Sequence, residues 1–366
     1  MKIYLDNAAS TPLDKEVYNA MTPYLLDQYG IPSAHHGYGR DAKAAIETSR
    51  ANVAKLLNAL PEEIIFTSGG TEANTIAIIS AVNCAFIDHI ITSPFEHPSV
   101  LNTLNALKRK HDIRISYLKH DERGNLDLDH LQYLLRTNTR NLVSVMNANN
   151  EVGNLNDIET IGLLCKKYKA LFHTDAAQTT GRYRHDVNNL NVNFLAASGH
   201  KFHGPKGIGF LYCRKGTRLS PALYGSKTEN IPGIIGLSRA LAIAHSEMEA
   251  QEKYIRGLKK RMIQQLAERL PSLTFNGNSE FSAKSIYTIL NINLPPANTN
   301  RSLVQYLDDN QVAVTGGNSS SSIVLKALGI ESHTDNIRFS FSKYNTVEEI
   351  DHVAAVIAAV YQTVAA

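Results

Sequence analysis

The stretch ALFHTDAAQ, residues 170–178, decides the fold class of this chain. It is an apolar run that ends at the carboxylate of Asp175, and the amide of Gln178 follows shortly after. Short apolar runs without alternation are typical of strands that are buried on both faces of a parallel sheet. Because ligands bind beyond the carboxyl ends of such strands, Asp175 is a candidate site residue. Taken alone, Asp175 would be interpreted as a helix cap, so a role in a functional site needs support from other segments of the sequence.

Strand-like and helix-like segments alternate on both sides of this stretch. The predicted strands are residues 64–67, 89–92, 113–119, 141–146, 170–174, 194–197 and 207–212. The predicted helices are residues 41–59, 71–82, 98–110, 128–136 and 158–168. Such alternation predicts an α/β fold in which a mostly parallel sheet is covered by helices on both sides.

The pattern changes after about residue 234. Apolar residues then recur at helical spacing as far as residue 270, which predicts one long helix or a kinked pair that ends before Pro271. The basic run Lys259-Lys260-Arg261 inside it is interpreted as a solvated face and not as a nucleic-acid patch. A second, smaller α/β unit follows. Its predicted strands are residues 285–293, 312–314 and 337–341, and its predicted helices are residues 301–307, 321–328 and a last helix opened by the capping box of Thr346 and Glu349.

Composition and charge exclude several classes of protein. Hydrophobic residues make up 43% of the 366 residues, and 37 basic residues nearly balance 34 acidic ones, so the chain predicts neither disorder nor nucleic-acid binding. Three cysteines are too few for a disulfide framework and lack metal-ligand spacing, so a reducing, cytoplasmic location is expected. The first residues hold no apolar region of a signal peptide. No apolar run reaches the roughly 20 residues of a membrane span, and residues 353–366 are interpreted as a packed terminal helix.

A lysine lies where the next predicted strand gives way to a loop. In ASGHKFHGPKG, residues 197–207, Lys201 is followed by glycine and proline. A lysine near a buried carboxylate suits pyridoxal 5′-phosphate (PLP), which needs a lysine for covalent attachment and an acid against its ring nitrogen. The alternative interpretation of Lys201 is an exposed loop lysine. His200 and His203 have no evident third partner for a metal ion, so no metal site is predicted.

A third segment is suited to holding a phosphate group. In IIFTSGGTEAN, residues 64–74, a predicted strand runs into two glycines, and a helix starts at about Thr71. Glycine permits close backbone approach, and a helix N-terminus supplies N–H groups and the positive end of the helix dipole. Such a short motif is weak by itself. The order of phosphate loop, acid and lysine along the chain is a much stronger indication of a PLP site.

A set of motifs is shared with one known family. They include YLDNAA (4–9), TSGGTEAN (67–74), EH (96–97), HTDAAQ (173–178) and IRFS (337–340), with further matches within 32–40, 143–153, 198–212 and 228–230. Over essentially its whole length the chain resembles the cysteine desulfurases that serve iron–sulfur cluster assembly, within the class V aminotransferases. The resemblance implies a PLP-dependent transferase of fold type I. Its large domain would be residues 15–250, its small domain residues 1–14 plus 251–366, and a homodimer would complete the site between them.

The resemblance also implies roles for individual residues. Lys201 matches the lysine that carries PLP, Asp175 the acid on its ring nitrogen, and Gln178 the amide on its ring hydroxyl. His97 matches the imidazole that stacks on the ring and relays protons, with a packed histidine at a helix start as the alternative. Arg338 matches the arginine that clamps the substrate carboxylate, a bidentate task that suits guanidinium. The remaining matches are Asn150 as a further cofactor contact, Gly70, Thr71, Ser198 and His200 on the phosphate side, Thr228 as a phosphate contact from the other subunit, and Asn7 with Arg338 in substrate binding.

The chain departs from this family at the loop that carries its nucleophile. The family has a cysteine between a Gly/Ser-rich turn and a helix, whereas residues 313–325 here form a shorter stretch without cysteine, and Ser320 lies nearest the cysteine's place. A serine hydroxyl cannot carry a persulfide. Cys84, Cys165 and Cys213 lie in other segments and do not substitute for it by position.

A second departure lies just before Thr228. The family has a Gly-rich segment with an arginine there, and residues 218–228 of this chain are several residues shorter. This weakens the expected phosphate contact from the other subunit, although Lys227 could partly replace the lost charge.

The expected function is a PLP-dependent, cysteine desulfurase-like enzyme that acts on cysteine or a related small sulfur amino acid. Its expected partners are a second subunit and a sulfur acceptor protein. The missing cysteine leaves two other PLP reactions open: a C–S lyase that eliminates the β-substituent, and an aminotransferase. A degenerate homologue that serves as a binding partner is the last alternative. The retention of Lys201, Asp175, Gln178, His97 and Arg338 together speaks against it.

Overall fold

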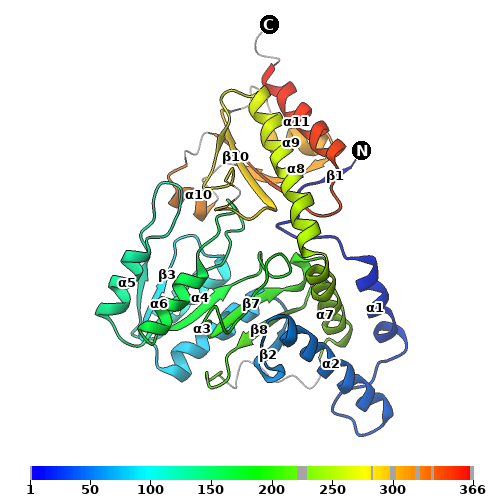
Figure 1. Cartoon of the computed structure of the whole chain (residues 1–366), viewed down its shortest axis with the longest axis vertical. Helices are drawn as coiled ribbons and strands as arrows, with labels where there is room; N and C mark the ends of the chain where they lie inside the picture. Colours follow the sequence, from blue (N-terminus) through cyan, green and yellow to red (C-terminus); the bar gives the residue numbers. More distant parts are fainter. Residues whose placement is uncertain are drawn as a thin grey trace.

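The largest sheet that the structure describes lies in the lower half of Figure 1, and two of its strands end at Asp175 and Ser198. The computed structural model describes residues 2–220, 229–281, 283–296, 302–317, 322–330 and 334–362. Within these ranges a seven-stranded sheet has the order β2-β8-β7-β6-β5-β3-β4. Its strands are β2 (Ile64–Thr67), β3 (His89–Thr92), β4 (Arg114–Tyr117), β5 (Asn141–Ser144), β6 (Leu171–Asp175), β7 (Phe194–Ser198) and β8 (Gly209–Cys213). Only β8 runs in the direction opposite to the other strands, so the predicted mostly parallel sheet is confirmed.

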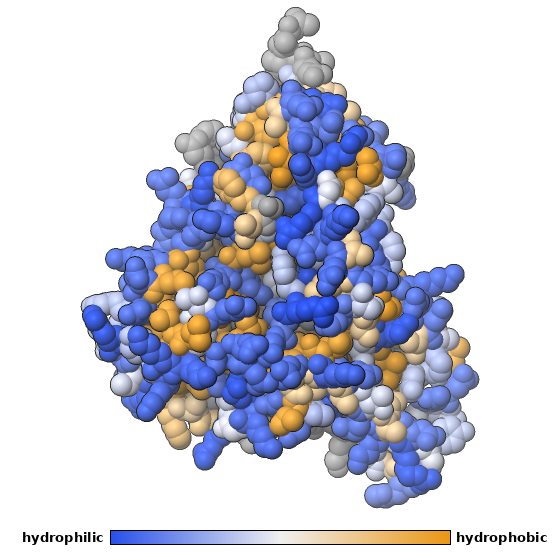
Figure 2. All heavy atoms as spheres, viewed as in Figure 1, coloured by the Kyte–Doolittle hydropathy of each residue, from blue (hydrophilic) through white to orange (hydrophobic). Residues whose placement is uncertain are grey.

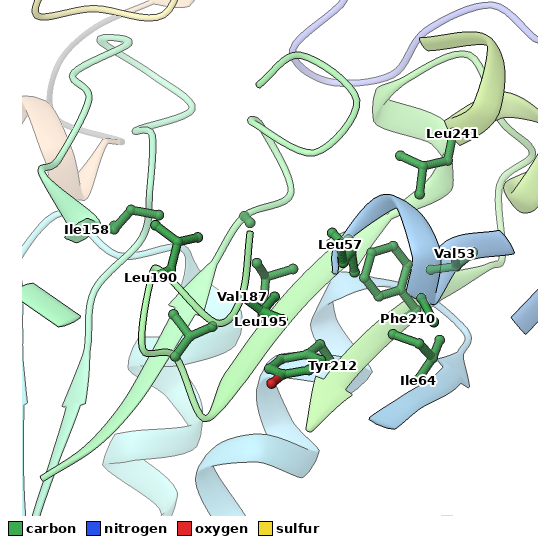
Figure 3. Close-up of a cluster of buried hydrophobic side chains, with 14 of the residues drawn as sticks. Val53, Leu57, Ile64, Ile158, Val187, Leu190, Leu195, Phe210, Tyr212 and Leu241 are labelled. Carbon is green, nitrogen blue, oxygen red and sulfur yellow. The ribbon is translucent and has the colours of Figure 1, made fainter. Parts of the chain in front are cut away.

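Helices cover both faces of this sheet. They are α1 (Lys15–Leu26), α2 (Gly37–Leu56), α3 (Gly70–Ala85), α4 (Pro98–Lys108), α5 (Leu128–Thr137), α6 (Ile158–Lys167) and α7 (Ile231–Ser246). Leu142 and Phe194 pack in one core with side chains of α3 and α4. Their neighbours Val143 and Leu195 pack in a second core with α2, α6 and α7, part of which is drawn in Figure 3. Successive strand residues point to opposite faces, so strands covered on both sides need the continuous apolar runs seen in the sequence.

A smaller assembly lies at the other end of the molecule in Figure 1. It contains a four-stranded antiparallel sheet of order β12-β13-β10-β9 and a parallel pair, β1-β11, among the described residues. These elements are β1 (Ile3–Tyr4), β9 (Thr274–Phe275), β10 (Ile289–Leu294), β11 (Val312–Ala313), β12 (Thr315–Gly317), β13 (Asp335–Ser340), α8 (Met248–Arg269), α9 (Leu303–Asp309), α10 (Ile323–Ala327) and α11 (Val347–Gln362). Ile3 and Leu5 of the N-terminal arm share one core with Met262, Phe339 and Ile357. The arm then continues toward the large sheet.

Several boundaries differ from the sequence predictions. The predicted long helix or kinked pair is a pair: α7 ends at Ser246, α8 begins at Met248, and Leu270 before Pro271 closes it. The strand predicted at 285–293 begins only at Ile289. The strand predicted at 312–314 is β11, which ends at Ala313, and the separate strand β12 that begins at Thr315 was not predicted. The capping box of the last helix is confirmed, because Thr346 Oγ1 accepts from the Glu349 N–H and a Glu349 carboxylate oxygen accepts from the Thr346 N–H.

The interpretation of Lys259-Lys260-Arg261 as a solvated face is wrong for its first member. Lys260 and Arg261 are exposed, but Lys259 is 5% exposed. Its Nζ donates to Ser285 Oγ at 2.7 Å and to the Ile286 carbonyl at 3.1 Å. Burial lowers the pKa of this amine to about 7. Lys259 therefore ties α8 to the segment before β10.

The terminal helix predicted from the apolar tail is present and packed. Val353, Ala354 and Ile357 of α11 are fully buried, and residues 363–366 lie outside the described part. No described helix is long and apolar enough to cross a membrane. Hydrophilic residues cover most of the face shown in Figure 2, with hydrophobic ones in small groups among them.

Candidate active site

A cavity of about 730 Å³ lies at the carboxyl ends of β6 and β7. Segments distant in the sequence line it: the N-terminal arm, the β2–α3 turn, the start of α4, the turn after β7, and β13. The predicted site residues that line it are Gly70, Thr71, His97, Asn150, Asp175, Gln178, Ser198, His200, Lys201 and Arg338. The parallel arrangement of β6 and β7 explains this gathering, since it brings their carboxyl ends to the same edge of the sheet.

Lys201 stands in the 3₁₀ turn Gly199–Lys201 that follows β7. Its Nζ donates to the carbonyls of Ala8 at 2.5 Å and Ala9 at 3.0 Å. Burial, together with the positive charges of Arg338 and Arg182, lowers the pKa of this amine to about 8. At pH 7 about a tenth of the amine is therefore unprotonated, far more than for an ordinary lysine, and attack on an aldehyde requires the unprotonated form.

Asp175 is the last residue of β6 and is buried. One of its carboxylate oxygens accepts from Asn74 Nδ2 at 2.7 Å, and the other accepts from the Ala177 N–H at 2.9 Å. Gln178 follows on the same turn and donates to the Ala8 carbonyl at 3.0 Å. The Gln178 amide thus lies beside the Lys201 amine, which contacts the same carbonyl, and Asp175 lines the same cavity.

The β2–α3 turn and the turn after β7 form one end of the cavity. The Gly70 N–H donates to Ser198 Oγ at 3.3 Å, and no side chain caps α3 at Gly69. A Cβ on Gly209 would lie 2.8 Å from Gly69 Cα, so glycine there allows the turn to approach β8. The exposed Lys206 also lines this end. A helix start with free N–H groups beside a cation is suited to a phosphate.

Some residues that line the cavity have buried polar atoms without a hydrogen-bond partner. Among the described residues, Gln178 Oε1, His200 Nδ1 and Arg338 Nε are buried and make no hydrogen bond. Burial and the charges of Lys201 and Lys206 lower the pKa of His200 to about 4. Unpartnered buried polar groups are costly, and these three belong to residues that line one cavity. A ligand with several polar groups would satisfy them, and the residues fit PLP: an amine, a carboxylate, an amide and a phosphate-binding helix start.

Arg338 is already engaged on part of its guanidinium group. Its Nη2 donates to Asp6 Oδ1 at 2.7 Å and to Thr315 Oγ1 at 3.0 Å, and its Nη1 donates to the Asn150 carbonyl at 2.8 Å. Only Nε is left without a partner. A substrate carboxylate would bind at Nε, or it would have to displace Asp6 from Nη2 to form a two-point contact with the guanidinium group.

The structure does not bring Asn7 into the cavity. Its Nδ2 donates to the Ser340 carbonyl at 2.8 Å and to Asn345 Oδ1 at 3.3 Å, and Asn7 is not among the lining residues. Its neighbours on the arm, Ala8 and Ala9, supply the carbonyls at Lys201 instead. The substrate-binding role of Asn7 stays a prediction that these contacts do not favour.

Three predicted positions lie outside the described residues: Thr228, Lys227 and Ser320. Among the described residues no cluster of three or more histidine, cysteine, aspartate or glutamate side chains could hold a metal ion.

Sequence reasoning missed several residues of the site. They are Asp6, Asn74, Ser99, Arg182 and Lys206, which bind or border the predicted residues. Arg182 is buried and donates to the carbonyls of Gln178 at 2.7 Å and Lys201 at 2.8 Å, which joins the two turns. Asp6 and Asn74 stand inside shared motifs, so a signal for them existed in the sequence.

Comparison with known proteins gives a consistent result. The model of the aminotransferase class V family matches residues 3–353. The chain is 39% identical to a cysteine desulfurase IscS of Dictyoglomus turgidum, over 97% of this chain and 93% of that protein. It is 38% identical to a putative cysteine desulfurase IscS 1 of Bacillus subtilis, over 97% and 98%. Among solved structures it is similar to a NifS-like protein, with 32% identity, a TM-score of 0.90 and coverage of 99% and 100%. It is also similar to SspA in complex with cysteine, with 30% identity, a TM-score of 0.80 and coverage of 94% and 100%.

Proposed function

The chain belongs to the class V aminotransferase family, and from this premise we propose that it is a cysteine desulfurase-like enzyme that acts on cysteine or a related sulfur amino acid. Members of this family use PLP. The observation that carries the proposal is the convergence of Lys201, Asp175 and Gln178 on one cavity. Bound PLP supplies an electron sink for bonds at the substrate Cα.

We assign the following tasks to the side chains. The Lys201 amine would attach the cofactor through its aldehyde, and its pKa of about 8 lets it hold or release a proton near neutral pH. The Asp175 carboxylate, which is held in place by its two hydrogen bonds, would keep a proton on the ring nitrogen. Gln178 would serve the ring hydroxyl, and the helix start at Gly70 with Ser198 and His200 would hold the phosphate. Arg338 binds the substrate carboxylate, for which its free Nε supports the assignment.

The group that accepts the substrate's sulfur has to come from outside the described site. Residues 313–325 contain no cysteine, and none of the cysteines lines the cavity. We therefore propose that an external thiol, of a small molecule or an acceptor protein, takes the sulfur: cysteine and RSH give alanine and RSSH. The same observation favours β-elimination as the second candidate, in which cysteine and water give pyruvate, ammonia and hydrogen sulfide.

Product analysis separates these reactions. Purified, PLP-loaded protein is incubated with cysteine, with and without an added thiol. Alanine formed in proportion to thiol persulfide supports desulfuration by an external acceptor. Pyruvate formed with equimolar ammonia, independent of added thiol, identifies a lyase. Turnover only with an added keto acid identifies an aminotransferase, and no turnover of cysteine, cystine or selenocysteine overturns the proposal.

We further propose a homodimer. Large apolar side chains are exposed around the connection from α1 to α2: Leu26 at 69%, Tyr29 at 74%, Ile31 at 51% and Tyr38 at 56%. The rings of Tyr29 and Tyr38 stack at 5.5 Å. Neighbouring exposed apolar side chains are typical of surfaces that another subunit covers. Light scattering of the purified protein tests this, and a monomer at micromolar concentration contradicts it.

A cytoplasmic location is also proposed. All three cysteines are free thiols, as expected of a reducing compartment. Fractionation of cells that express the protein tests the location.

A further inference from the structure

A buried amide joins two of the site's functional groups. Asn74 lies in α3, is 1% exposed and borders the cavity. Its Nδ2 donates to Asp175 Oδ2 at 2.7 Å and to Ser99 Oγ at 2.9 Å, so both of its N–H groups are used. Its Oδ1 lies 3.0 Å from Nε2 of His173. All of these partners are buried as well.

The chemistry of the partners fixes the direction of these hydrogen bonds. An ionised carboxylate only accepts, so the Asn74 amide must turn its NH₂ toward Asp175 and its oxygen toward His173. His173 Nε2 therefore carries the hydrogen. Burial lowers the pKa of His173 to about 4, so the ring is neutral at neutral pH and holds a single N–H. Its Nδ1 then accepts from Ser144 Oγ, 2.9 Å away.

The second arm of the network reaches His97 through Ser99. Because Ser99 Oγ accepts from Asn74, its own hydrogen is free to point at His97 Nδ1, which lies 2.8 Å away. The backbone N–H of Ser99 donates to the same nitrogen at 3.1 Å. His97 Nδ1 is thereby held as an acceptor. In the neutral ring the hydrogen must sit on Nε2.

We propose that Asn74 is a positioning residue that couples the Asp175 carboxylate to the tautomer of His97. This rests on the proposed function for its consequence, because Asp175 and His97 are the groups that would face the PLP ring from different elements. A single orientation of the Asn74 amide then fixes the orientation of the Asp175 carboxylate at the end of β6 and the tautomer of the His97 imidazole at the start of α4. Asn74 acts through these partners and needs no contact with the substrate.

Removal of the amide has two separable effects. Asp175 Oδ2 loses its donor, so the carboxylate is less well oriented toward the cofactor's ring nitrogen. Ser99 Oγ loses the donor that fixes its own hydrogen, so His97 is less firmly held in one tautomer. Histidine tautomers are set by the hydrogen bond at the other ring nitrogen, and they are visible without any turnover.

The test compares three variants by nitrogen NMR of histidine-labelled protein and by PLP affinity from equilibrium dialysis. In Asn74→Ala, we expect His97 to show a mixture of tautomers and PLP to bind about tenfold more weakly. In Ser99→Ala, we expect a change at His97 at least as large, because the hydroxyl that contacts His97 Nδ1 directly is removed, and PLP affinity close to wild type, because the Asn74–Asp175 bond remains. The matched control is Asn141→Ala, which removes another buried asparagine bonded to a histidine, with Asn141 Oδ1 2.7 Å from His89 Nδ1. Asn141 and His89 are the first residues of β5 and β3, so this pair lies at the end of the sheet away from the cavity. Neither the His97 spectrum nor the PLP affinity should therefore change in Asn141→Ala.

Three results decide the proposal. If Asn74→Ala keeps both the His97 signals and the wild-type PLP affinity while unfolding as easily as Asn141→Ala, Asn74 is only structural and the proposal is wrong. If Asn74→Ala does not fold, an unchanged His97 spectrum in Ser99→Ala overturns it in the same way. Failure of the proposed function gives a different result, because wild-type protein would then not bind PLP. The His97 spectra of PLP-free wild type and Asn74→Ala would still show whether Asn74 controls the His97 tautomer.

Discussion

At the scale of single residues, Lys201 has the environment of a reactive amine. It is flanked by two backbone carbonyls, and its pKa of about 8 is lowered chiefly by burial. We expect Lys201→Ala to lose the PLP adduct that borohydride makes permanent, measured by protein mass after reduction. Lys206→Ala is the control, since Lys206 borders the same cavity but is exposed. In wild type, attachment should speed up as pH rises through about 8, because the unprotonated amine reacts. A permanent adduct in Lys201→Ala would refute the assignment.

Asp175 uses both of its oxygens as acceptors, one for Asn74 and one for the Ala177 N–H. An amide offers only one acceptor, so Asp175→Asn loses a hydrogen bond as well as the charge at the ring nitrogen. We expect the variant to keep PLP but to turn over roughly a hundredfold more slowly, equivalent to about 2.7 kcal/mol of barrier. Turnover under saturating substrate and the PLP content of the same samples are the measurements. Activity within about twofold of wild type would reject the role, because that corresponds to well under 1 kcal/mol.

Arg338 is expected to act on substrate affinity alone. In wild type, Nη1 and Nη2 of Arg338 donate to the Asn150 carbonyl and to Asp6, and Nε has no partner. A lysine keeps the positive charge but loses the planar guanidinium group that makes these contacts. Arg338→Lys should raise the KM for the amino acid about tenfold or more and leave the PLP absorbance unchanged. The control is Arg261→Lys, at an exposed pair with Asp351 far along α8. Equal KM values for both variants would make Arg338 a purely structural ion-pair residue.

Individual residues also show where the sequence stops being informative. Lys201 and Asp175 could be predicted because each follows a recognisable apolar strand. Asn7 and Asp6 are adjacent in a shared motif, and no local pattern tells which one faces Arg338; the structure has Asp6 on the guanidinium and Asn7 on Ser340. The choice depends on how the arm lies against β13, which is a contact across more than three hundred positions of sequence.

At the scale of elements, strongly periodic or fully apolar segments were predicted and weakly patterned ones were missed. The central strands and α3 to α6 were found within a few residues. The helix α1 was not predicted, since Val17 is its only buried residue and Pro23 lies inside it. The sequence nevertheless contained a signal for the start of this helix, because aspartate is a preferred N-cap residue. In the structure Asp14 is the N-cap and accepts from the Glu16 N–H at 2.9 Å.

Helix α8 offers a stability prediction at the buried Lys259. Its pKa is about 7 in the folded chain and near the ordinary lysine value when unfolded, so above pH 7 the unfolded state binds more protons. Stability from this group therefore rises with pH between about 7 and 10, by at most about 1.4 kcal/mol per pH unit. Lys259→Met should lack this rise, as measured by urea unfolding at several pH values. The neighbouring exposed Lys260→Met should keep it, and a pH dependence shared by both variants would contradict the prediction.

At the scale of the whole molecule, the N-terminal arm connects two cores. Ile3 and Leu5 pack with residues of α8, α11 and β13, and three residues later the Ala8 carbonyl contacts both Gln178 and Lys201. One segment therefore packs in the core of the small sheet and also lines the cavity at the end of the large one. The division into residues 15–250 and residues 1–14 plus 251–366 stays a prediction, which the separate cores of the two sheets support.

The molecule as a whole offers no internal thiol close to the site among its described residues. Cys84 lies in α3, Cys165 in α6 and Cys213 in β8, and none lines the cavity. Burial raises the thiol pKa of Cys213 to about 12 and that of Cys165 further still. Since the thiolate is the nucleophile, neither buried thiol is ready to attack a substrate sulfur at neutral pH.

A cysteine-free chain should consequently remain active. We expect the combined variant Cys84→Ser, Cys165→Ala, Cys213→Ala to release sulfur from cysteine within about twofold of the wild-type rate, a difference well under 1 kcal/mol of barrier. The two alanine changes remove buried side chains and cost stability, so PLP content and thermal unfolding are recorded beside the rate to separate inactivation from unfolding. Wild-type protein is examined by mass spectrometry after turnover. One additional sulfur atom on a single cysteine, together with loss of alanine production when only that cysteine is replaced, would mean that the chain carries its own nucleophile, and an external acceptor would no longer be needed.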